Sequence, residues 1–341
     1  MMLSDPRFVA LSHWLRQYFD DEVAIKLICG DASFRRYFRV HHQGKHYIVS
    51  DSPIDLVPIA PFVAMAKAYQ RAGLLVPEVL ATCHEYGFVL QTDVGEQQLL
   101  SVLNKENVTH YYQQALNLLP TIATVTQTEN GALIDFDATF VARELAIFID
   151  WLVNEHLDYS LTEHEQQLIT SAFRALTANV LAQPHVGMHR DYHSRNLLIN
   201  GSQLAVIDFQ DAVLGPVTYD AVSLLRDCYV RWPDAIVDPL MAYHYQLAIE
   251  HKLIDKTLAL STYKQWFDLM GLQRHIKAAG IFARLYHRDG KPGYLADIPL
   301  TLRYIADIGA QYPQIAAFSE WVGQTLLPRV KQRNLDLVGC H

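Results

Sequence analysis

The spacing of apolar residues along the first ninety positions switches several times between the period of a strand and that of a helix. Where apolar residues recur at every third or fourth position we expect a helix, and where they alternate with polar residues we expect a strand. From residue 95 onward the helical period dominates, interrupted by one short strand-like stretch over residues 197–209. The first part is expected to contain a helix over 8–19, strands over 34–40 and 47–49, a helix over 61–72, and short strands over 79–81 and 88–91.

This order of elements predicts an α+β protein in two parts, a small β-rich N-terminal lobe over residues 1–94 and a large helical C-terminal lobe over residues 95–341. The chain has 341 residues, of which 50% are hydrophobic and 19% charged, as in ordinary globular proteins. The N-terminus lacks the pattern of a signal peptide, and no apolar run approaches the roughly 18 residues that span a bilayer. We therefore expect a cytoplasmic protein.

Composition narrows the classes of ligand. The formal net charge is −8, from 28 basic and 36 acidic residues, so the surface as a whole does not attract nucleic acid or an anionic membrane. The four cysteines form no C-x-x-C pair, and the sixteen histidines show no zinc spacing, which argues against a disulfide framework and a transition-metal site. Cationic ligands are not excluded by this net charge, and local basic patches remain compatible with it.

One polar motif carries most of the chemical information. Residues 189–196 read H-R-D-x-x-x-x-N, and an apolar strand beyond them ends at Asp208. Asn-Gly at positions 200–201 predicts a tight hairpin, and a hairpin that closes around residue 202 places Asn196 and Asp208 nearly opposite each other. Cross-strand neighbours lie about 5 Å apart, close enough to share one cation. Asp191 could then face the hydroxyl of an acceptor.

Phosphoryl transfer needs this combination of groups. It requires a carboxylate near the attacking hydroxyl and oxygen ligands that hold Mg²⁺ against the phosphates of ATP. The sequence therefore predicts an enzyme that uses ATP and Mg²⁺, with Asp191 as the general base and with Asn196 and Asp208 as the metal ligands.

The same residues resemble the catalytic loop and metal-binding aspartate of the aminoglycoside phosphotransferase/choline kinase family within the protein-kinase-like superfamily. The resemblance implies a protein-kinase-like two-lobed fold and a His189 that braces the catalytic loop. Tyr219-Asp220 resembles the family segment whose aspartate anchors that loop from the next helix. By their position in such a fold, Gln91 and Asp93 are expected to contact the adenine of ATP.

The chain departs from this family at one important place. The third strand of the family usually carries a lysine that contacts the ATP phosphates, paired with a glutamate of the next helix. Here that strand ends in Ser50-Asp51, and the helix over 61–72 contains no glutamate. We expect Ser33 and neighbouring backbone amides to cover the phosphates, while Arg35 or Arg36 supplies the missing positive charge. The alternative is that both arginines are surface charges on an exposed strand.

The stretches G-D-A-S-F-R-R-Y-F-R (30–39), D-Y-H-S-R-N (191–196) and D-F-Q-D-A (208–212) narrow the resemblance. They are similar to bacterial sugar kinases that phosphorylate N-acetylmuramate and N-acetylglucosamine at the anomeric hydroxyl during cell-wall recycling. Residues 274–291 contain five lysines and arginines and one acid, which suits an anionic acceptor. We expect Arg274 and Arg284 to contact that acceptor, unless the basic segment is a solvated helix face. Asp211 could approach the acceptor or cap a turn.

Two alternatives remain open. A kinase for another alcohol, such as choline, homoserine or an aminoglycoside, would need an acidic acceptor pocket when its substrate is cationic. A nucleotide-binding pseudokinase is favoured by the missing lysine. The retained base and metal ligands count against it, because a scaffold needs none of the three.

Overall fold

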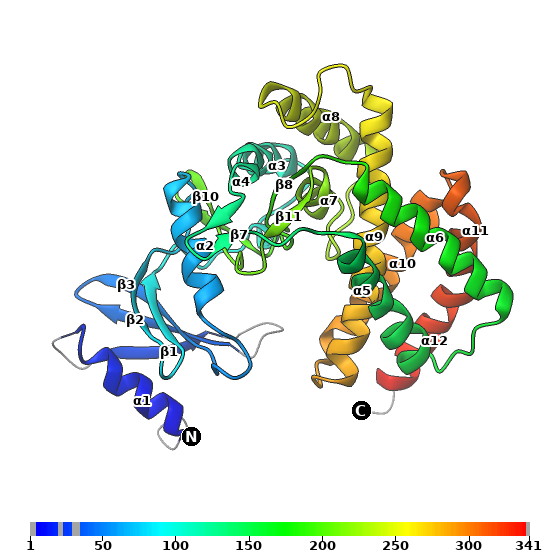
Figure 1. Cartoon of the computed structure of the whole chain (residues 1–341). Coiled ribbons are helices and arrows are strands. Elements are labelled where there is room, and N and C mark those ends of the chain that lie inside the picture. The colour runs from blue at the N-terminus through cyan, green and yellow to red at the C-terminus, as the bar shows by residue number, and fades with distance from the viewer. Residues whose placement is uncertain (1–4, 20–22, 29–34, 339–341) are drawn as a thin grey trace. The chain divides into compact units, whose positions relative to one another are not determined.

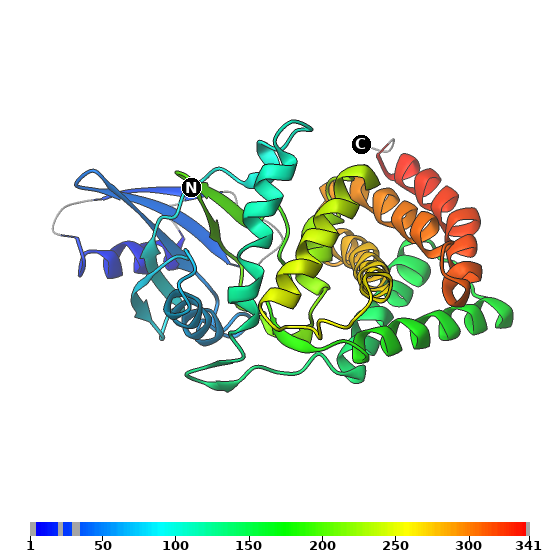
Figure 2. The ribbon, with the colours of Figure 1, turned by 90° about the horizontal axis from the view of Figure 1, so that it is seen from above.

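The computed structural model describes residues 5–19, 23–28 and 35–338, shown in two views in Figures 1 and 2. The chain divides into two compact units. The first contains Met1–Val102, Gln127–Ala132 and Arg195–Ala212, and the second contains Leu103–Thr126, Leu133–Ser194 and Val213–His341. Residues 195–212, which carry the metal-site candidates, thus group with the N-terminal part although they are distant from it in sequence.

The first unit is built on a five-stranded antiparallel sheet with the strand order β1-β2-β3-β5-β4. Two helices accompany the sheet, and the first of them begins where the Asp5 carboxylate accepts the N–H of Arg7 at 2.9 Å and Pro6 occupies the first turn. The elements are α1 (Pro6–Leu15), β1 (Ala24–Ile28), β2 (Arg36–His42), β3 (Lys45–Asp51), α2 (Ala60–Arg71), β4 (Val79–Cys83) and β5 (Phe88–Thr92).

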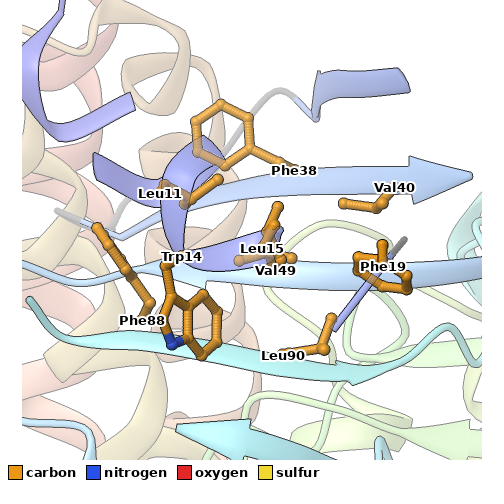
Figure 3. Close-up of a cluster of buried hydrophobic side chains, with 9 residues drawn as sticks. All are labelled: Leu11, Trp14, Leu15, Phe19, Phe38, Val40, Val49, Phe88 and Leu90. Atoms are coloured by element: carbon orange, nitrogen blue, oxygen red, sulfur yellow. The ribbon is translucent and has the colours of Figure 1, made fainter. Parts of the chain in front are cut away.

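The core of this unit lies between α1 and one face of the sheet. Alternation along each strand turns every second side chain toward the helix, and the apolar face of α1 covers them (Figure 3). The buried cluster consists of Leu11, Trp14, Leu15, Phe19, Phe38, Val40, Val49, Phe88 and Leu90. Side chains at the intervening strand positions, such as Arg35 and Tyr37, are therefore left for the opposite face.

Replacing Leu15 with alanine is expected to destabilise the first unit by about 2–5 kcal/mol, because Leu15 is fully buried and its loss leaves a cavity. Chemical denaturation followed by circular dichroism measures the change. Val9→Ala is the matched control, since Val9 lies on the same helix with 51% of its surface exposed. Equal losses of stability in the two variants would show that α1 does not hold this core together.

The second unit is mostly helical and is organised around α9 (Leu260–His287), the yellow-to-orange helix in Figure 2. At Gly280 of α9 an added Cβ would come within 2.6 Å of the main chain at Ile147, so the backbones of α9 and its neighbour pack against each other directly. The other helices of the described part of this unit are α3 (Val108–Leu116), α4 (Leu119–Ala123), α5 (Ala138–Ile147), the π-helix η3 (Phe148–His156), α6 (Glu163–Leu181), α7 (Tyr219–Leu225), α8 (Asp234–Glu250), the 3₁₀-helix η4 (Pro292–Asp297), α10 (Ile298–Gly309), α11 (Pro313–Trp321), the π-helix η5 (Val322–Leu326) and α12 (Leu327–Val338).

Most of the predicted elements are present with shifted ends. The helix predicted over 61–72 is α2, and the long helical pattern after residue 140 continues from α5 into η3. Five of the described strands were not predicted: β1, the short antiparallel pair β6 (Gln127–Thr128) and β7 (Gly131–Ala132), and the antiparallel pair β8 (His185–Met188) and β11 (Val213–Pro216). In the described part of the chain, no helix is both long enough and apolar enough to cross a membrane.

Candidate active site

The predicted hairpin exists in the first unit. β9 (Leu197–Asn200) pairs with β10 (Gln203–Val206) through a two-residue turn in which Gly201 has φ +59°. The hairpin is tied to the segment after β5, because the side-chain amide of Asn200 donates to the carbonyl of Val94 at 3.0 Å and the N–H of Ile199 donates to the carbonyl of Gln97 at 2.9 Å. These bonds hold β9 against the segment that follows β5.

The register of the hairpin differs by one residue from the prediction. The turn is centred between residues 201 and 202, so the residue opposite Asn196 is Ile207. The N–H of Ile207 donates to the Asn196 carbonyl at 3.1 Å. Asn196 and Asp208 are therefore one position away from direct opposition. Their side chains nevertheless meet, because Asp208 adopts a left-handed backbone (φ +65°) and its Oδ2 accepts a bond from Nδ2 of Asn196 at 3.3 Å.

This pair suits a hard cation. Carboxylate and amide oxygens are the ligands that Mg²⁺ prefers, and Mg²⁺ takes only one or two carboxylates from a protein when phosphates and waters complete its shell. The described residues contain no group of three or more His, Cys, Asp or Glu side chains that could hold a metal by themselves. The left-handed backbone of Asp208 carries strain of about 1–3 kcal/mol, as is common at functional sites.

The two arginines of β2 and its approach lie on opposite faces of the sheet. Arg36 faces α1: its Nε donates to Oδ2 of Asp51 at 3.0 Å, it also pairs with Asp5, and its guanidinium lies 5.7 Å from the ring of Phe38. Asp51 is fully buried and is bonded by Arg7 as well. Asp51 lies near the position where the lysine was expected, and arginines on the face of the sheet toward α1 neutralise its charge.

Arg35 lies on the face of the sheet opposite to α1. It is 6% exposed, and its guanidinium lies 5.8 Å from the ring of Phe62, which stacks on Phe209 with a centroid distance of 5.1 Å. Burial raises the pKa of the Tyr37 hydroxyl, the positive charge of Arg35 acts against that rise, and the negative charge of Asp208 adds to it. Of the two arginines, Arg35 is therefore the one in the electrostatic environment of Asp208.

The other nucleotide candidates are placed as follows. Gln91 is buried on β5, and its Oε1 has no hydrogen-bond partner among the described residues. Asp93 is already bonded, since it accepts from Nε of Arg39 at 2.6 Å and from the N–H of Gly95 at 2.9 Å. Ser33 lies outside the described residues.

The catalytic-loop candidates belong to the second unit, and Asp220 anchors them. Its carboxylate accepts the backbone N–H of His189 at 2.7 Å and that of Arg190 at 3.0 Å, as the family resemblance implies. Burial raises the pKa of Asp220 to about 7. The ring of His189 is buried, and its Nδ1 accepts the N–H of Asp191 at 3.2 Å. This contact supports a bracing role for His189.

Asp191 itself is partly exposed and negatively charged. Burial alone would raise its pKa, but the positive charges of Lys277 and Arg190 outweigh that effect and hold the pKa below its ordinary value. An ionised carboxylate that keeps some exposed surface can orient a hydroxyl group and accept its proton.

Two buried acids of this unit were not predicted. Asp227 accepts the N–H of Ser194 at 3.1 Å and so holds the far end of the catalytic loop. Glu144 of α5 binds Arg190, the residue before Asp191. A signal for Glu144 was present in the sequence, because it shares the apolar face of its helix with Val141, Leu145 and Phe148, where an acid requires a buried partner.

The predicted substrate residues occupy different places. Arg274 is buried on α9 with its guanidinium 5.1 Å from the ring of Tyr219, and its Nε and Nη1 have no hydrogen-bond partner in the part of the chain that is described. Arg284 is half-buried, and burial lowers its pKa. Asp211 belongs to the first unit, where it is exposed and receives a weak bond from Gln210 at 3.4 Å.

Comparison with known proteins agrees with these features. The model of the phosphotransferase enzyme family matches residues 24–253. The N-acetylmuramate/N-acetylglucosamine kinase of Pseudomonas aeruginosa is 36% identical over 330 residues, which cover 94% of this chain and 97% of the relative. Choline kinase LicA from Streptococcus pneumoniae superposes with a TM-score of 0.62 at 12% identity, covering 87% of this chain and 97% of that one. ADP-bound aminoglycoside phosphotransferase APH(2'')-Ib gives a TM-score of 0.59 at 15% identity, covering 86% and 96%.

The chain belongs to the phosphotransferase enzyme family, whose model covers more than half of its length. It is a small-molecule kinase, since its curated relatives are kinases over nearly the whole chain. The structural neighbours confirm the predicted protein-kinase-like fold with a sheet-based and a helical part.

Proposed function

We propose that this kinase transfers the γ-phosphoryl group of ATP to the anomeric hydroxyl of N-acetylmuramate or N-acetylglucosamine, in the cytoplasm and in the service of cell-wall recycling. One observation carries the proposal: a curated relative of that activity is 36% identical over 94% of this chain. An alignment that covers this much of the chain includes both the catalytic loop and the basic segment on α9. The proposed location follows from the substrate ATP, which is a cytoplasmic metabolite.

In the proposed reaction Asp191 is the general base. Its Oδ atom accepts the proton of the acceptor hydroxyl while the hydroxyl oxygen forms a bond to the γ-phosphorus and the bond from that phosphorus to the ADP oxygen breaks. The lowered pKa of Asp191 keeps the carboxylate ready to accept that proton at neutral pH. Asp220 and Asp227 hold the two ends of the loop that presents it.

The nucleotide is proposed to bind through the first unit. Asn196 and Asp208 would hold Mg²⁺, which neutralises phosphate charge when bound. Gln91 would offer its buried amide to the adenine, with Asp93 beside it, and Ser33 would cover the phosphates.

Arg35 is the proposed replacement for the missing lysine. Arg35→Ala is expected to raise the KM for ATP roughly 10- to 100-fold, because a charge-assisted bond to phosphate contributes about 1.5–3 kcal/mol. Arg36→Ala is the matched control: its charge is engaged by Asp51 and Asp5 on the other face of the sheet. Steady-state kinetics with varied ATP distinguishes them, and equal KM values for the two variants would remove Arg35 from the phosphate site.

The acceptor is tested by incubating the protein with Mg-ATP and each candidate sugar and by measuring ADP release and sugar 1-phosphate. We expect product with N-acetylmuramate and N-acetylglucosamine, where Arg274 or Arg284 could bind the lactyl carboxylate of the former. Choline, homoserine and an aminoglycoside test the alternative of another alcohol. A rise in melting temperature with nucleotide, without turnover on any acceptor, would instead indicate a pseudokinase.

A further inference from the structure

A buried acid on α5 joins the catalytic loop to α9. Glu144 is 4% exposed, and its Oε1 accepts bonds from Nη2 of Arg190 at 2.8 Å and from Nζ of Lys277 at 2.9 Å. Its Oε2 accepts a bond from Nε2 of Gln273 at 3.0 Å. Because two cations and an amide satisfy this carboxylate, its burial is compensated, and removing its charge would take a carboxylate contact from both cations.

Arg190 is the residue of the catalytic loop that Glu144 binds directly. It has a left-handed backbone (φ +76°) immediately before Asp191, a conformation that a non-glycine residue keeps only when its surroundings fix it. Two acids do so from separate helices, because Asp220 of α7 binds the backbone N–H of Arg190 and Glu144 of α5 binds its guanidinium. The direction in which the chain enters Asp191 is therefore set by both contacts.

Lys277 binds Glu144 and also acts electrostatically on Asp191. It is 9% exposed, its Nζ also contacts the hydroxyl of Tyr219 at 3.3 Å, and its charge acts on Asp191. The charged and titratable groups that act on Asp191 are Lys277 and Arg274 from α9, His189, Arg190 and His193 from the loop, and Asp220 from α7.

We propose that Glu144 is a positioning residue of this kinase, which holds the backbone before Asp191 through Arg190 and holds Lys277 as the counter-charge of Asp191. The proposal rests on the proposed role of Asp191 as the base. It assigns to a buried acid of α5, outside the catalytic loop, the task of keeping the reacting carboxylate in place.

The kinetic test uses Glu144→Gln, Lys277→Met and Lys277→Arg in the full chain with Mg-ATP and the amino sugars. Glu144→Gln and Lys277→Met are expected to lower kcat roughly 10- to 100-fold, as displacements of about 1 Å at a catalytic group do, while the KM for ATP changes less than about twofold. Lys277→Arg keeps the positive charge and should therefore retain most of the wild-type activity. Lys264→Met is the matched control, because this lysine of α9 pairs with Asp268 of the same helix at 2.8 Å.

The pH profile separates positioning from a merely structural role. A base acts only when deprotonated, so kcat/KM rises with pH through the pKa of Asp191. Since Lys277 lowers that pKa, Lys277→Met should move the acidic limb of the profile to higher pH, whereas Lys277→Arg and Lys264→Met should leave it in place. An unshifted limb in Lys277→Met, together with unchanged kcat in Glu144→Gln, would overturn the proposal.

A second measurement does not depend on the acceptor. Amide hydrogen exchange of the peptide covering residues 186–195 is expected to speed up in Glu144→Gln and to stay unchanged in Lys264→Met. Faster exchange in Glu144→Gln, in a protein whose wild type phosphorylates no amino sugar, would support the positioning role and reject the proposed substrate. Wild-type exchange and kcat in Glu144→Gln, in a protein that does phosphorylate amino sugars, would reject only the positioning role.

Discussion

Asp191→Asn is expected to lower kcat by about 10²- to 10⁴-fold while nucleotide binding stays within about twofold of the wild type. The substitution keeps the shape of the side chain but removes its ability to accept a proton, and general bases contribute rate enhancements of this size. The backbone anchors of the loop, from Asp220 to His189 and Arg190, do not involve the Asp191 carboxylate. Turnover is measured by ADP release, and nucleotide binding by the rise in melting temperature with Mg-ADP.

Two outcomes would contradict this role of Asp191. Retained turnover would assign proton removal to another group. Loss of turnover together with lost nucleotide binding or a lower melting temperature would show that the residue supports the fold of the loop and not the chemistry. Asp137→Ala is a useful comparison, because that aspartate caps the N-terminus of α5 through the N–H of Phe140 at 2.7 Å, and its removal should lower stability without a specific loss of kcat.

Asp208→Asn is expected to lower turnover by about 10²- to 10³-fold and to raise the Mg²⁺ concentration needed for half-maximal activity. The carboxylate is the only charged member of the pair with Asn196, and charge stabilisation by a bound metal accounts for several kcal/mol at a phosphoryl group, which corresponds to this range of rates. Initial rates at varied Mg²⁺ and saturating ATP measure the effect.

Asp211→Asn provides the control for this experiment. Asp211 lies three residues beyond Asp208, is exposed and contacts Gln210, so its replacement should leave the dependence on Mg²⁺ unchanged. If Asp211 approaches the acceptor, only the KM for the sugar should rise. An Asp208→Asn variant with wild-type dependence on Mg²⁺ would refute the metal site.

The sequence was most informative where chemistry is carried by a short local pattern. The hairpin signal at residues 200–201 and the H-R-D-x-x-x-x-N motif predicted the proximity of Asn196 and Asp208, whose side chains are in contact. The register was off by one because a turn signal fixes the presence of a hairpin more firmly than the residue at its centre. Only the backbone of Asp208 could show how the two side chains still meet.

Residues that act through distant contacts were harder to find. The sequence predicted the strand that contains Arg36, but the acid that pairs with it, Asp51, and the helix on that face of the sheet come from other segments of the chain. Glu144 and Asp227 have no local motif, since each contacts a residue 33 to 46 positions away. The strands β8 and β11 were missed for the same reason, because they pair across 25 or more residues.

Gly280 gives the helical unit a steric sensitivity that charge alone would not reveal. A single methyl group at this position would press on the main chain of Ile147. Ile147 lies three residues along α5 from Glu144, and Gly280 lies three residues along α9 from Lys277. Separating the two helices there would stretch the ion pair that spans them. A mutation that looks like a packing defect would then first be noticed in the laboratory as a slow enzyme rather than as an unstable protein.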